Sequence, residues 1–142
     1  MREETMLSPE ILIFNLAVVF FHQLATAFLW VILDAITSNQ NFRQQDDSKT
    51  THYPWKASLA LTFLLAFPSL IMCFRPVHIS NYGLVLTLYF WVIVAGGLFS
   101  LYSWARFANS RNLRTLHLAT TATLTTAVGI LFGFVASMAS PV

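Results

Sequence analysis

The sequence predicts an all-α integral membrane protein, an antiparallel bundle of four transmembrane helices joined by short loops. Hydrophobic residues make up 56% of the 142 residues and charged residues only 10%, whereas a soluble domain carries roughly 25% charged residues. A small soluble fold must cover a large surface with polar groups, and eight basic and six acidic side chains are too few for that task. The surface is therefore expected to face lipid.

Four apolar runs, each of about 20 residues or more, match the length of helix that crosses a hydrocarbon core of about 30 Å. None of them shows the alternation with a period of two that marks a strand. A segment that spans lipid must pair its backbone groups within a helix or a closed barrel. We therefore expect a single membrane domain of residues 1–142 with helices at residues 11–36, 55–74, 82–102 and 113–138.

The ends of the runs carry helix-boundary signals. Ser8, Pro9 and Glu10 supply a capping hydroxyl, a first-turn proline and an acid before the first run. Residues 37–54 are rich in Asn, Gln and Asp and are expected to form a solvated loop. Pro68 should kink the second helix. Residues 103–112 are expected to form a short loop, and short connections favour antiparallel neighbours.

Basic residues predict the orientation, because cytoplasmic loops of membrane proteins carry an excess of Lys and Arg. The N-terminal tail and the second loop contain only Arg2 and Arg75. We therefore expect both termini on the non-cytoplasmic side and loops 37–54 and 103–112 in the cytoplasm. The basic residues of these two loops and their flanks are Arg43, Lys49, Lys56, Arg106, Arg111 and Arg114.

The first helix carries its polar residues on one face. At 100° per residue, an arc of roughly 120° holds all of them, and the opposite arc holds none. A charged or amide group exposed to hydrocarbon costs several kcal/mol, so this arc should face other helices of the protein. Its members are Asn15, His22, Gln23, Thr26 and Asp34.

Two further polar residues, Arg114 and His117, lie near the start of the fourth run. Asp34 lies near the end of the first helix, and His117 lies near the start of the fourth, one turn after Arg114. In an antiparallel bundle these groups can meet. Such a contact can lock two helices together, or it can serve as a proton relay or charged gate. The predicted polar network comprises Asn15, His22, Gln23, Asp34, Arg114 and His117.

The two histidines inside the runs are also candidate ligands of a b-type haem, and a quinone is the other candidate cofactor. The alternative for His22 is an interhelical hydrogen bond to a neighbour such as Thr87 or Ser100. The four histidines lack HxxxH or HExxH spacing, and we expect no metal site. Cys73 is the only cysteine, so no disulfide within the chain is possible.

The fourth run contains a GxxxG motif formed by Gly129 and Gly133. Small residues at this spacing let helix backbones approach closely. The motif can pack against another helix of the same bundle or against another subunit, and the sequence leaves both options open.

These observations favour a small non-catalytic subunit, or an assembly and stabilising partner, of a larger membrane protein complex. The expected partners are the lipid bilayer and other membrane subunits or further copies of the chain. No basic run indicates nucleic acid, and no catalytic constellation indicates an enzyme. The two alternatives are electron transfer, with haem or quinone held by His22, His117 or both, and a small proton- or ion-coupled transporter that uses Asp34.

Overall fold

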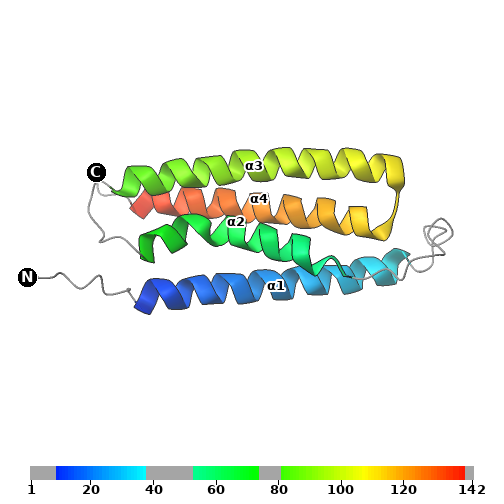
Figure 1. Cartoon of the computed structure of the whole chain (residues 1–142), viewed down its shortest axis with the longest axis horizontal. Coiled ribbons are helices and arrows are strands. Elements are labelled where there is room, and N and C mark those ends of the chain that lie inside the picture. Colours follow the sequence, from blue (N-terminus) through cyan, green and yellow to red (C-terminus); the bar gives the residue numbers. More distant parts are fainter. Residues whose placement is uncertain (1–8, 38–52, 74–80, 140–142) are drawn as a thin grey trace, which may run out of the picture.

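The computed structural model of the chain describes residues 9–37, 53–73 and 81–139. Within these ranges the chain is all-helical, with α1 (Pro9–Thr37), α2 (Trp55–Cys73), α3 (Asn81–Ser110) and α4 (Leu113–Ala139) (Figure 1). This confirms the prediction of four helices. Three of them contain segments long and apolar enough to cross a membrane, while the apolar part of α2 is shorter. The long segments are Leu12–Thr37, Gly83–Ser110 and Leu113–Val135, and the shorter one is Trp55–Ile71.

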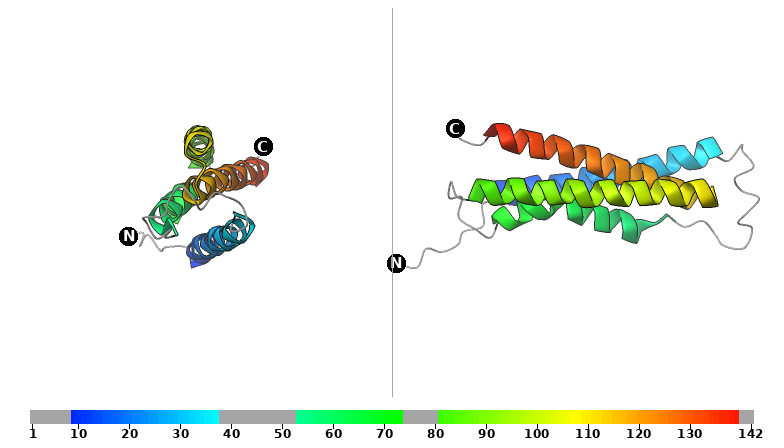
Figure 2. Two further views of the ribbon diagram at one scale, coloured as in Figure 1. Left: turned by 90° about the vertical axis from the view of Figure 1, so that its right-hand side faces the viewer. Right: turned by 90° about the horizontal axis from the view of Figure 1, so that it is seen from above.

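The helices run alternately up and down, so that α1 begins at the end of the bundle where α4 finishes (Figure 1). Seen end-on, α2 and α4 occupy the centre, and α1 and α3 lie at opposite corners (Figure 2). The most extensive packing joins α3 to α4, followed by α1 to α2. Residues of α1 and residues of α3 therefore meet different faces of α4.

The interior is built from small and hydroxyl-bearing side chains, whereas the outer surface is apolar. The described core includes Leu65, Ala66 and Ala119, together with many buried Ser and Thr residues. By contrast, Phe28 and Leu101 are exposed over more than 60% of their surface. A soluble protein shows the opposite arrangement, because water rewards burial of large apolar side chains.

The end of α3 differs from the prediction. Residues 103–112 were expected to form a loop, but the helix continues to Ser110, and only residues 111 and 112 connect it to α4. Residues 103–110 contain neither Pro nor Gly, so nothing in them breaks the helix. Arg111 follows the helix with a left-handed φ of 47°, and its backbone N–H donates to the carbonyl of Phe107 across 2.8 Å.

The start of α4 follows directly from this turn. The side-chain oxygen of Asn112 accepts a 2.8 Å hydrogen bond from the backbone N–H of Thr115. Asn112 thus caps a backbone donor that the first turn of a helix leaves unpaired. This two-residue connection holds α3 and α4 as a tight antiparallel hairpin.

Glycine residues allow α3 and α4 to pack closely along the hairpin. A Cβ atom added to Gly96 would lie 2.8 Å from the hydroxyl oxygen of Thr126. A Cβ atom on Gly133 would lie 3.6 Å from the side chains of Ile93 and Tyr89. The GxxxG motif of α4 therefore packs against α3 of the same chain.

The second helix bends in its last turns (Figure 1). Pro68 lies inside α2 and is buried there. A proline in a helix interior lacks the N–H donor and displaces the preceding turn, which accounts for the bend. Residues 38–52 of the expected solvated loop, and residue 74, the expected end of the second helix, lie outside the described residues.

Candidate functional site

A hydrogen-bonded cluster of buried and half-buried side chains occupies the space between α1, α2 and α4. We call it the polar core. It joins side chains that are far apart in the sequence, and it reaches from the start of α2 to the middle of the bundle. Its members are His22, Gln23, Thr26, Tyr53, Ser58, Thr62, His117, Thr121 and Thr125.

His22 bridges two helices with one ring. Its Nδ1 atom lies 2.7 Å from Oγ1 of Thr62 on α2, and its Nε2 atom lies 2.9 Å from Oγ1 of Thr125 on α4. The side chain is 6% exposed. Both ring nitrogens are therefore engaged, and the imidazole ties α1 to both central helices.

The expected partners of His22 were wrong. Thr87 donates to the carbonyl of Gly83 in its own helix, and Ser100 pairs with Thr123. Both residues lie on α3, which packs chiefly on α4 at the corner opposite α1. The partners that the structure assigns to His22 come instead from the two central helices.

The two hydroxyls beside His22 also bond the backbone of their own helices. The hydroxyl of Thr125 donates to the carbonyl of Thr121 across 2.8 Å, and that of Thr62 donates to the carbonyl of Ser58 across 2.9 Å. The oxygen of Thr62 also receives a hydrogen bond from the side-chain amide of Gln23. Each ring nitrogen of His22 thus meets a hydroxyl that its own helix holds in place.

Thr26 joins α1 to the part of the polar core near the start of α2. Its hydroxyl lies 2.8 Å from the phenol oxygen of Tyr53 and 2.8 Å from Oγ of Ser58. Ser58 in turn lies 3.4 Å from the amide oxygen of Gln23. These contacts anchor the beginning of α2 to the middle of α1.

His117 is completely buried beside this group. Its Nε2 atom donates to the backbone carbonyl of Thr26 across 2.8 Å, and since a carbonyl can only accept, Nε2 carries the ring proton. Its Nδ1 atom has no hydrogen-bond partner among the described residues. The ring lies edge-on to Trp30 and Tyr53, with centroids 5.2 and 5.4 Å away.

The remaining predicted network residues lie apart from this cluster. Asn15 is buried and accepts a hydrogen bond from Ser69, two turns of α1 away from His22. Asp34 is half-buried and Arg114 is exposed. In the part of the chain that the structure describes, no ion pair joins Asp34 to Arg114 or His117. His117 instead contacts α1 two turns earlier, at Thr26.

The hydroxyl partners on α2 were not predicted from the sequence. Ser58, Thr62 and Ser69 are buried and share one face of that helix. Their spacings of four and seven residues are those of a single helical face, and this pattern could have indicated which side of α2 is turned inward. Thr121 and Thr125 on α4 carry the same signal.

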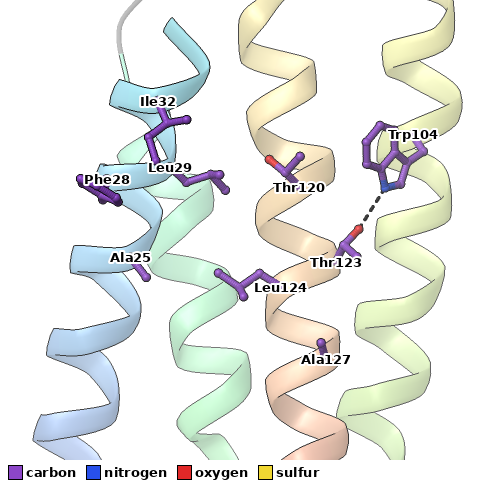
Figure 3. Close-up of a pocket in the computed structure, with 9 residues that line it drawn as sticks. All are labelled: Ala25, Phe28, Leu29, Ile32, Trp104, Thr120, Thr123, Leu124 and Ala127. Carbon is purple, nitrogen blue, oxygen red and sulfur yellow. Dashed lines mark hydrogen bonds between the residues drawn. The ribbon is translucent and has the colours of Figure 1, made fainter. Parts of the chain in front are cut away.

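A second feature is an apolar groove of about 510 Å³ between α1 and α4, closed on one side by Trp104 of α3 (Figure 3). We call it the α1–α4 groove. Its few polar groups are already bonded: Thr123 donates to the carbonyl of Ala119 and accepts from the indole N–H of Trp104. The groove is lined by Ala25, Phe28, Leu29, Ile32, Trp104, Thr120, Thr123, Leu124 and Ala127.

Among the described residues, no group of three or more His, Cys, Asp or Glu side chains is close enough to hold a metal ion. Comparisons of the chain with protein-family models, curated proteins and solved structures give no match.

Proposed function

We propose that the chain is an integral membrane protein that crosses the bilayer four times and serves as a non-catalytic subunit, or an assembly and stabilising partner, of a larger membrane complex. The observation that carries this proposal is the double hydrogen bond of His22 to Thr62 and Thr125. The polar side chains of the interior are engaged in holding helices of the same chain together, which is the chemistry of a packing unit.

Four spans are supported by the position and length of α2. Its 19 residues rise about 28 Å as a helix, close to a hydrocarbon core of about 30 Å. It lies at the centre of the bundle and packs on all three other helices. A helix so enclosed needs less lipid-facing apolar surface than the three longer ones.

The proposed orientation follows the basic residues. Lys56, Arg106, Arg111 and Arg114 lie at the end of the bundle where α1 and α3 finish. Cytoplasmic loops carry such an excess, so we place this end in the cytoplasm and both termini on the other side.

The proposed contact surface for other subunits is the outer face of α3. This helix stands at a corner of the bundle (Figure 2), and large apolar side chains along it are exposed. Other membrane helices can pack there without leaving a buried polar group unpaired. The face includes Phe90, Trp91, Leu98, Leu101 and Tyr102.

A haem or quinone site receives less support. His22 would have to release Thr62 or Thr125 before a ring nitrogen could bind iron. His117 is enclosed by Trp30 and Tyr53 and holds the carbonyl of Thr26 with one nitrogen. A reduced-minus-oxidised absorption spectrum of the purified chain tests this alternative, because a bound b-type haem would give its characteristic bands.

Proton transport also receives less support. Within the described part of the chain, the hydroxyls of Tyr53 and Ser58 reach Thr62 and His22 through the side-chain amide of Gln23. An amide does not readily pass a proton from its oxygen to its nitrogen, so the path is interrupted. Transport by Asp34 would be lost in an Asp34→Asn variant reconstituted into vesicles, whereas unchanged flux would exclude that role.

The subunit proposal is tested by purifying a tagged chain from its native membrane in a mild detergent and identifying the proteins that accompany it. We expect a stable assembly with other membrane chains, which cross-linking should place against α3. A parallel purification of a Trp91→Ala, Leu98→Ala double variant is the matched test, because it trims the outer face without touching the polar core. Recovery of the chain only as a monomer or homo-oligomer would contradict the proposal.

A further inference from the structure

Histidine side chains make both of the hydrogen bonds that join α1 to α4 in the polar core. His22 of α1 contacts Thr125 of α4, and His117 of α4 donates to the backbone carbonyl of Thr26 of α1. These two helices pack less extensively on each other than α3 and α4 do, and the α1–α4 groove lies between them. The polar contacts between α1 and α4 therefore depend on two imidazole rings.

The surroundings of His117 suit a neutral ring. Its Nε2–H donates to Thr26, while its buried Nδ1 atom makes no hydrogen bond to the described residues. In the neutral ring Nδ1 is a lone pair. A second proton would turn it into an N–H donor with no acceptor, and it would add a charge to a completely buried side chain. Both changes cost free energy in the packed bundle.

No described anion contacts this ring to balance an added charge. Its neighbours are Trp30 of α1, Tyr53 just before α2 and Thr121 of its own helix. Asp34 lies one turn of α1 beyond Trp30, about 6 Å along the helix, and forms no ion pair with His117 within the described ranges. The other described charges at this end of the bundle are positive and exposed, and they belong to Lys56, Arg106, Arg111 and Arg114.

His22 is placed differently. Each of its ring nitrogens meets a hydroxyl, that of Thr62 or that of Thr125. A hydroxyl oxygen can accept from an N–H while it donates to the carbonyl of its own helix, as both of these do. A doubly protonated ring at His22 would therefore find an acceptor at each nitrogen. Among the two imidazoles, the one that a proton would leave unpaired is His117.

We propose that His117 is a proton-sensitive latch: the neutral ring holds α1 against α4, and uptake of a proton at Nδ1 releases that contact. The ring lies four residues from the start of α4, about 6 Å along the helix, so a small separation of α1 from α4 at this end admits water to it. The proton comes from that water, and no other reactant is needed. The latch does not depend on the role of the chain as a subunit.

The direction of the response follows from counting protons. An exposed imidazole has a pKa of about 6.5, so below that pH the open form carries one proton on His117, whereas the closed form carries none there. Low pH therefore favours the open form. Because a single proton is taken up, the ratio of open to closed bundles should rise by up to about tenfold for each pH unit below about 6.5.

Distances between spin labels on the whole chain in detergent micelles measure the opening. On a Cys73→Ser background, one pair joins Ile36→Cys near the end of α1 to Asn109→Cys near the end of α3, and both positions are exposed. The control pair joins Asn109→Cys to Ile130→Cys, an exposed position of α4. We expect the first distance to lengthen between about pH 7 and about pH 5. The second should stay constant, because it lies within the α3–α4 hairpin.

Substitutions at the two histidines show which ring is responsible. His117→Phe and His117→Gln both remove the group that takes up the proton, and the label distance should then be independent of pH. His22→Phe leaves the ring of His117 in place and should keep the response. An opening that persists unchanged in both His117 variants would refute the latch, because another group, such as His52 or His78, would then be its cause.

Ring-nitrogen NMR of the chain with isotope-labelled histidine separates the remaining outcomes. The resonances of His117, assigned by their loss in His117→Phe, should show one protonated and one bare nitrogen at neutral pH. The imidazolium form should appear only together with the longer label distance. An imidazolium at His117 in bundles whose label distance has not changed would overturn the proposal, since the closed form would then hold the proton. A distance that stays constant down to about pH 4.5 would overturn it as well.

Discussion

The Nε2 atom of His117 donates a 2.8 Å hydrogen bond to the backbone carbonyl of Thr26, a residue 91 positions earlier in the chain. The contact joins the first helix to the last at the point where Thr26 also holds Tyr53 and Ser58 through its hydroxyl. Thr26 of α1 thus bonds α2 through its hydroxyl and α4 through its backbone carbonyl.

Replacing His117 by Phe should change the free energy of unfolding by less than about 1 kcal/mol. The variant loses one hydrogen bond, but it also removes the buried Nδ1 atom that has no partner among the described residues. His117→Ala, which removes the ring between Trp30 and Tyr53, should cost about 2–4 kcal/mol. Reversible unfolding in mixed micelles measures both values, and a large loss in the Phe variant would mean that Nδ1 makes an essential contact.

A double-mutant cycle on His22 and Thr125 should give a coupling free energy of about 0.6 kcal/mol and no more than about 1.7 kcal/mol, the range for hydrogen bonds between membrane helices. The variants are His22→Phe and Thr125→Val. Thr126→Val is the control, because Thr126 donates to the carbonyl of Ala122 and lies beside Gly96 rather than His22. A coupling with Thr126 equal to that with Thr125 would show that the ring does not bond Thr125.

Gly96→Ala should destabilise the bundle by about 1–3 kcal/mol, the usual cost of overpacking. The added methyl would lie 2.8 Å from Oγ1 of Thr126, which is held by its own hydrogen bond. Gly97→Ala, one residue on, should be neutral or stabilise by up to about 1 kcal/mol, because its Cβ meets nothing within 4 Å and alanine favours helix. Thermal unfolding of the two variants side by side measures the difference in stability between them. Equal stabilities would mean that α3 and α4 lie further apart at Gly96 than the structure places them.

Asp34→Asn should stabilise the chain slightly, by about 0.3–1 kcal/mol, because a carboxylate near the C-terminal end of α1 opposes the helix dipole. Glu10→Gln should have the opposite sign, because Glu10 lies in the first turn of the same helix. Both variants are compared by unfolding at low ionic strength. Destabilisation by Asp34→Asn would instead indicate that Asp34 has a charge partner, such as Arg114 or His117, the partners predicted from the sequence.

The helices were predictable because apolar runs and flanking boundary signals are local properties of a sequence. The prediction of a loop over residues 103–110 depends on Arg106 and the neighbouring Ser and Asn, but polar residues also occur in the exposed end of a helix. The absence of Pro and Gly there was the better signal.

The hydrogen-bond partners of His22 could not be predicted from the pattern of residues along a single helix. The helical period places His22 on the polar face of α1, but it does not say which helices lie opposite that face. That depends on the order of the helices around the bundle, where α3 stands at the far corner and α2 and α4 occupy the centre. The chain has many Ser and Thr hydroxyls. To identify Thr62 and Thr125 as the partners of His22, one must know the order of the helices and how each helix is rotated about its axis.

The place of α4 at the centre of the bundle has a consequence for biogenesis. When a ribosome delivers the chain in order, the first three helices emerge without the partner of the Nε2 atom of His22, since Thr125 belongs to the last helix. The α3–α4 hairpin, joined by only two residues, can associate as soon as it is complete. We expect the hairpin to close onto α1 last, and a product truncated before residue 113 would lack the hydroxyl that pairs with Nε2 of His22.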